Sequence, residues 1–165
     1  MLTTLQIVTL MLVALAMVPA AAHALELPGK MRLPREIYLA VQRIYYPGFT
    51  VAGFAEVFSM LAALALVFIT PRESAAFGLS LGALVLLLAM HAIYWGITAP
   101  VNKIWLKGQR LSKTGETFFR VNDDADELPP AEWTSLRNRW EYSHVVRAVL
   151  VTIALALLAS AVAIS

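Results

Sequence analysis

The chain has 165 residues, of which 59% are hydrophobic and only 15% charged, and its mean hydropathy is +0.70. Soluble domains balance apolar and charged residues more evenly, so this composition indicates an integral membrane protein. The absence of cysteine excludes disulfides, thiolate metal ligands and cysteine nucleophiles. The formal net charge is only +2, and we expect no nucleic acid partner.

Four apolar runs divide the chain, and they predict membrane-spanning helices at about residues 2–24, 50–70, 75–99 and 142–164. Each run is long enough to cross about 30 Å of hydrocarbon as a helix. The turn at residues 70–74 is short, so the second and third spans should be antiparallel neighbours. The expected fold is all-α: a four-transmembrane-helix bundle, one domain over residues 1–165, with the lipid bilayer as its surroundings.

The first run ends in Ala22-His23-Ala24, which resembles the small-residue cleavage site of a signal peptide. Two features favour a retained span instead. No lysine or arginine precedes the run, and the run is longer than a signal-peptide core usually is. Cleavage would leave three spans, and the connections described next would still share one side.

Lysine and arginine are concentrated in the two long connections, 26–48 and 100–140, whereas the opposite side has only Arg72. Positively charged connections remain in the cytoplasm, so both termini should lie on the non-cytoplasmic side of what we expect to be a bacterial inner membrane. Pro34 can begin a short helix at the membrane surface that ends at Pro47-Gly48. Residues 115–127 are typical of an exposed loop.

After this loop, one helical stripe leads from the connection into the fourth span, with Trp133, Leu136, Trp140, His144 and Arg147 at steps of three and four residues. A histidine and an arginine at the mouth of a span are costly unless something nearby uses them.

Counting residues along each helix places the other polar groups at a similar depth in the cytoplasmic half of the bundle. We therefore expect all three histidines to converge there with the one acid that lies well inside a span. The full set is His23, Glu26, Glu56, His91, Tyr94, His144 and Arg147. These residues could also have a purely structural role, because Glu56 could pair with Arg147 and the histidines could join helices by hydrogen bonds. The tryptophans could form an interfacial belt.

Pro100-Val-Asn102, followed by a polar loop and then Trp133, Leu136-Arg137, Arg139-Trp140, His144 and Arg147, resembles the anthrone-oxygenase-like family of small four-helix membrane proteins. Most members of that family are uncharacterised. The resemblance implies a four-helix bundle and, from the best-known relatives, oxidation of an anthrone to an anthraquinone by molecular oxygen without a cofactor. His23, Glu26, Glu56 and His91 lie outside the matched pattern and leave the cofactor open.

The first hypothesis is therefore a membrane oxygenase that acts on a lipophilic aromatic molecule, anthrone-like or quinol-like. His144 would remove a proton, and Arg147 or Asn102 would stabilise the oxyanion that forms. Glu56 and His91 would complete the polar cavity. The substrate would lie against Trp140 or Tyr94.

In a metal-assisted version, His23, Glu26, Glu56, His91 and His144 would be the ligands, and iron or copper would be favoured over zinc. The sequence has no dense Glu-x-x-His repeat of the di-iron type, which weighs against this version. The alternative function is a non-catalytic accessory or scaffold subunit, in a homo-oligomer or a larger membrane complex. A proton-coupled transporter is a third class, disfavoured by the lack of an inverted repeat.

Overall fold

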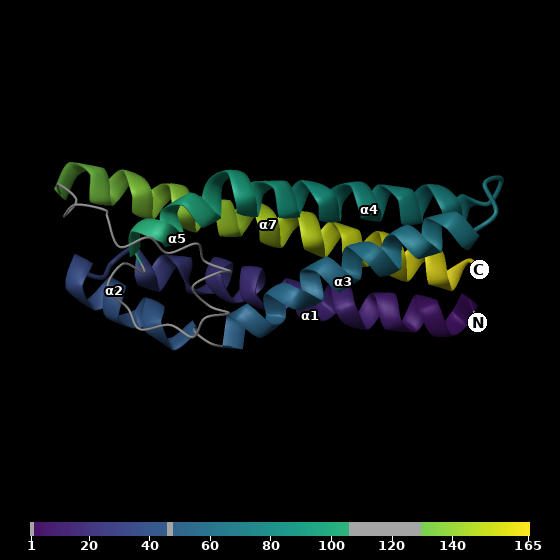
Figure 1. The fold of residues 1–165 in the computed structure, drawn as a ribbon, viewed down its shortest axis with the longest axis horizontal. Helices are drawn as coiled ribbons and strands as arrows, with labels where there is room; N and C mark the ends of the chain where they lie inside the picture. The colour runs from purple at the N-terminus through teal and green to yellow at the C-terminus, as the bar shows by residue number, and fades with distance from the viewer. Residues whose placement is uncertain (1, 46–47, 106–129) are drawn as a thin grey trace.

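The computed structural model describes residues 2–45, 48–105 and 130–165, and within them the fold is all-α, as predicted. Figure 1 shows how the helices are arranged. In chain order they are α1 (Leu2–Lys30), α2 (Arg35–Gln42), the 3₁₀ turn η1 (Arg43–Tyr45), α3 (Gly48–Ile69), α4 (Ala75–Ile93), the π-helical turn η2 (Tyr94–Thr98), α5 (Ala99–Trp105) and α7 (Pro130–Ala163).

Four helical stretches are long and apolar enough to cross a membrane, so this is an integral membrane protein. They cover Leu2–Lys30, Gly48–Ile69, Ala75–Ile104 and Glu132–Ala163. Both termini and the α3–α4 turn lie at one end of the bundle, and α2 and α5 lie at the other (Figure 1). Ser74 begins α4 as a side-chain cap, because its Oγ accepts a hydrogen bond of 3.2 Å from the Phe77 N–H.

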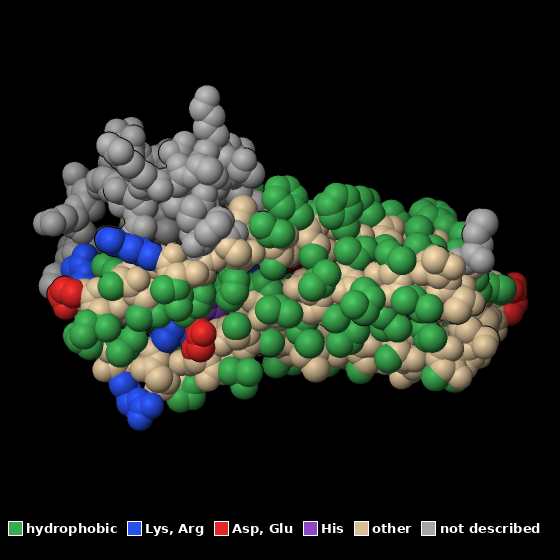
Figure 2. All heavy atoms as spheres, turned by 90° about the horizontal axis from the view of Figure 1, so that it is seen from below, with side chains coloured by type: hydrophobic (Ala, Val, Ile, Leu, Met, Phe, Trp, Pro, Cys, Tyr) green, Lys and Arg blue, Asp and Glu red, His purple; other side chains and the backbone are tan. Residues whose placement is uncertain are grey.

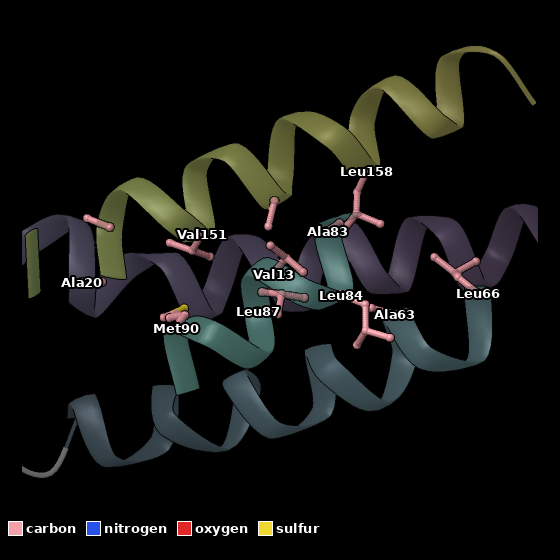
Figure 3. Close-up of a cluster of buried hydrophobic side chains, with 12 residues drawn as sticks. Val13, Ala20, Ala63, Leu66, Ala83, Leu84, Leu87, Met90, Val151 and Leu158 are labelled. Carbon is pink, nitrogen blue, oxygen red and sulfur yellow. The ribbon is translucent and has the colours of Figure 1, made fainter. Parts of the chain in front are cut away.

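The four long helices form a closed ring in which α1 and α4 each pack against both α3 and α7. Helices α3 and α7 therefore face each other across the bundle. Small and branched side chains such as Val13, Ala63, Leu87 and Val151 fill the interior (Figure 3). Large apolar side chains cover the outside of the membrane part, and charged side chains gather at the α2 end (Figure 2). This is the arrangement that lipid requires.

The third span continues beyond its predicted end at residue 99, because a π-helical turn carries the helix past Pro100. Proline has no N–H to donate and its ring clashes with the carbonyl four residues earlier, which usually ends a helix. Here the Ala99 N–H bonds to the Tyr94 carbonyl five residues back, and the wider turn accommodates the proline. The helix then continues as α5, which brings Asn102 to the bundle.

The first helix also exceeds its predicted span, since α1 continues through Pro28 and Gly29 to Lys30. A buried ion pair at Lys30, described below, outweighs the poor helix propensity of those two residues. Helix α7 is one continuous helix from the connection into the membrane, as the stripe of residues predicted. The predicted loop at 115–127 lies outside the described residues.

Candidate functional site

The polar residues converge at one membrane boundary. About 20 helical residues cross the hydrocarbon, and counting them from the end that holds the termini reaches about His23 in α1, Tyr94 after α4 and His144 in α7. In α3 the same count ends at about Thr50. Glu56 lies six residues closer to the middle of the membrane, which places it about 9 Å inside the hydrocarbon. A carboxylate at that depth needs a partner.

The partner of Glu56 is Arg147, across the diagonal of the bundle. Arg147 Nη2 donates to Glu56 Oε2 at 2.6 Å, and both side chains are buried. A guanidinium and a carboxylate at this distance form a charge-assisted hydrogen bond, stronger than a neutral one. The Arg147 guanidinium also lies 5.1 Å from the centre of the Tyr94 ring, within the range of a cation–π contact.

His91 is fixed as one tautomer by two neighbours. Trp95 Nε1–H donates to His91 Nε2 at 2.8 Å, so this nitrogen carries a lone pair. The proton of the neutral ring is therefore on Nδ1, which donates to Glu56 Oε1 at 3.0 Å. The His91 side chain is 29% exposed, whereas those of Glu56 and Arg147 are only 7% and 6% exposed. Glu56 and His91 thus form a carboxylate–imidazole dyad whose basic nitrogen, Nε2, contacts Trp95.

His144 is buried and bonded to the same arginine. Arg147 Nη1 lies 3.3 Å from His144 Nδ1, and a guanidinium can only donate, so Nδ1 is the acceptor. The structure therefore joins the three residues predicted to meet, Glu56, His91 and His144, into one chain of contacts through Arg147.

His23 approaches His144 from α1, with their ring centres 4.2 Å apart. Lys30 Nζ lies 3.1 Å from His23 Nδ1, and Glu26 Oε2 lies 3.8 Å from the same nitrogen. The edge of the His23 ring meets Trp140 at 4.7 Å between ring centres. This part of the site is polar at its nitrogens and aromatic around them.

A second buried ion pair continues the network toward α2, and its residues are not among those predicted from the sequence. Lys30 Nζ lies 2.9 Å from Glu141 Oε2, and the Tyr38 hydroxyl donates to Glu141 Oε1 at 2.6 Å. Glu141 is fully buried. Its spacing three residues before His144 places both on one helix face and was the available signal. From the sequence, Lys30 is only one of the positive charges in the connection 26–48 that predict its cytoplasmic side.

Tyr45 closes the network near the start of α3. Its hydroxyl donates to Glu26 Oε2 at 2.5 Å. Burial and this hydrogen bond raise the pKa of the Tyr45 phenol above its ordinary value. Glu26, which is 41% exposed, is the most accessible carboxylate of the site.

Asn102 positions an aromatic ring. Trp140 Nε1–H donates to Asn102 Oδ1 at 2.7 Å, and both residues are buried. The π-helical turn adds a second link between the same two helices, because Thr98 Oγ1 and Ser143 Oγ are 2.8 Å apart. The Pro-Val-Asn segment and the Trp-Arg-His stripe, which lie far apart in sequence, are thus held together.

The structure does not bring the five residues predicted as metal ligands together as one close set. Within the described residues no three His, Asp or Glu side chains are grouped closely enough to hold an ion. Two cationic side chains already contact these residues: Arg147 is bonded to Glu56 and His144, and Lys30 contacts His23. In this structure the polar contacts of these residues are internal ones.

In a comparison with known protein families, residues 41–157 match the anthrone oxygenase family model. The chain belongs to the anthrone oxygenase family. The matched residues include Glu56, His91, Asn102 and the Trp140–Arg147 stretch, whereas His23, Lys30 and Tyr38 precede them. No curated protein and no solved structure matches the chain.

Tyr38 gives the site a measurable pH response. Burial and the Glu141 carboxylate raise the pKa of its phenol far above the ordinary value of about 10. The folded protein should retain this proton at pH values where the unfolded chain releases it, so the free energy of unfolding should fall as the pH rises above about 10. An ultraviolet titration of tyrosinate absorbance should show a late component that Tyr38→Phe removes. Loss of an ordinary component near pH 10 instead would contradict the assignment.

Proposed function

We propose that this protein is a membrane-embedded oxygenase that oxidises a lipophilic aromatic substrate, anthrone-like or quinol-like. The reaction would take place at the polar layer, by which we mean the side chains of His23, Glu26, Glu56, His91, Tyr94, His144 and Arg147. The observation that supports it best is the family match, since the matched residues contain the whole Glu56–His91–Arg147–His144 chain. The layer also supplies what the chemistry needs, an oriented base beside a fixed positive charge.

In this proposal His91 is the base. Its Nε2 is the acceptor nitrogen of a ring that Glu56 orients, whereas the acceptor nitrogen of His144 is bonded to cationic Arg147. His91 Nε2 takes a proton from the substrate C–H after Trp95 moves aside. The carbanion then gives its electrons to molecular oxygen. For an anthrone the methylene group becomes a carbonyl group, and one oxygen atom of O₂ leaves as water.

Arg147 is the source of positive charge near the carbanion, and Tyr94 supports its guanidinium from one side. Asn102 is a positioning residue that orients the Trp140 ring against which a flat substrate would lie. His91 is partly exposed and Trp95 is 37% exposed at the outer surface of the bundle, so an apolar substrate would enter from lipid at this point.

Oxygen uptake by purified protein tests this assignment. With an anthrone or a hydroquinone as substrate, His91→Ala should lower kcat by roughly 10²-fold or more, because general bases contribute about 10²–10⁴-fold. Leu88→Ala is the matched control, since Leu88 is exposed about one turn earlier on the same helix. Wild-type uptake in His91→Ala would exclude His91 as the base. Absence of uptake by the wild-type protein with both substrates would favour the accessory or scaffold function.

The orientation that we propose places the polar layer on the cytoplasmic side of a bacterial inner membrane, with both termini outside. Because the chain has no cysteine, single cysteines can report this directly. In spheroplasts, an impermeant maleimide should label Glu73→Cys, in the α3–α4 turn, and should label Arg43→Cys only after the membrane is opened. The reverse pattern would show the opposite orientation.

A further inference from the structure

His23 and His144 form a pair that the proton-transfer step does not use. They belong to different helices, α1 and α7, and both are buried, with exposed fractions of 3% and 5%. Their ring centres are 4.2 Å apart and their planes are inclined at 47°. The family model does not include His23, because the match begins at residue 41.

Two cations determine which nitrogen of each ring bears hydrogen. Lys30 Nζ contacts His23 Nδ1 at 3.1 Å, and Arg147 Nη1 contacts His144 Nδ1 at 3.3 Å. Ammonium and guanidinium groups have hydrogen atoms to donate and no lone pair to offer, so both Nδ1 atoms are acceptors. The hydrogen of each neutral imidazole is therefore on Nε2. Both rings present the same kind of group, an N–H donor, on the side away from its cation.

The donor of His144 has no acceptor within the described residues. His144 Nε2 is buried and makes no hydrogen bond there. A buried donor without an acceptor is destabilising, so such a group in a native protein calls for an explanation, and a bound molecule is one. A ligand that supplied an oxygen lone pair at this point would remove the penalty.

The surroundings of the pair indicate what kind of molecule would supply that oxygen. The His23 ring meets the edges or faces of Tyr45, Phe49 and Trp140, with ring centres 4.4, 5.1 and 4.7 Å away. Aromatic rings favour a flat aromatic ligand. The nearby carboxylates are already engaged, since Glu26 accepts from Tyr45, Glu56 from Arg147 and His91, and Glu141 from Tyr38 beside Lys30.

We propose that His23 and His144 form a binding site for the carbonyl oxygen of an aromatic ketone, which becomes the enolate oxygen when the substrate loses its proton. This inference rests on the proposed function and adds to it the group that recognises the substrate. Two N–H donors bind an oxygen more tightly as its negative charge grows, so the pair stabilises the enolate more than the ketone. Lys30 and Arg147 strengthen the effect, because each polarises one imidazole from behind.

A coloured probe tests the site without turnover. A monohydroxyanthraquinone is already oxidised, and its phenolate absorbs at longer wavelength than its phenol. Bound to wild-type protein in detergent, its phenol should ionise at least about one pH unit lower than in protein-free micelles, because hydrogen bonds to the charged form lower a pKa. His144→Phe, which keeps a ring, should abolish this shift, and His23→Phe should reduce it. Ser160→Ala, at the far end of α7, should keep it.

No shift with the wild-type protein, or an equal shift in His144→Phe, would overturn the proposal. Nitrogen-15 NMR of histidine-labelled wild-type protein gives a readout that does not depend on how the variants fold. His23 and His144 should appear as Nε2–H tautomers and His91 as the Nδ1–H tautomer, and the probe should move the Nε2 signal of His144. An Nδ1–H tautomer at His144 would refute the donor site. Oxygen uptake without a probe shift would leave the oxygenase standing and reject this site, and a shift without uptake would do the reverse.

Discussion

The ion pair between Glu56 and Arg147 is the interaction on which the rest of the site depends. It crosses the bundle between α3 and α7, two helices that do not adjoin in the ring of packed helices. Desolvating two charges inside a membrane is costly, and their mutual contact, together with the hydrogen bond from His91 to Glu56, offsets that cost. Once formed, the pair determines where His91, Tyr94 and His144 lie, because each contacts Glu56 or Arg147 directly.

Around this pair the network has two parts, one inside and one mostly outside the residues that match the family model. The inner part, from His91 to His144, lies wholly within the residues that match the anthrone oxygenase family. The outer part joins His23, Lys30 and Tyr38, which precede the match, to Glu141 on α7. In the function that we propose, the inner part transfers the proton and the outer part holds the imidazole donors in place. Their meeting point is the contact between His23 and His144.

The sequence was sufficient to predict the fold because the signals were local: four apolar runs, a short turn, and a polar stripe at helical spacing. It also predicted that Glu56, His91 and His144 would converge, since depth can be counted along helices that cross one membrane. The sequence could not decide which partner each buried polar side chain contacts. Whether a buried carboxylate meets a metal or a guanidinium depends on rotation of the helices about their axes. The sequence does not predict the Lys30–Glu141 pair for the same reason. The π-helical turn before Pro100 is also not predictable, because a proline by itself indicates the end of a helix.

The most direct test of this account is the coupling between Glu56 and Arg147. We predict that Glu56→Gln and Arg147→Gln each lower the free energy of unfolding in mild detergent by about 3–5 kcal/mol, because each leaves one buried charge unpaired. The double variant should lose less than the sum of the two, by a coupling energy of about 1–3 kcal/mol, the range for residues in contact. Strictly additive losses would contradict the claim that this pair organises the site.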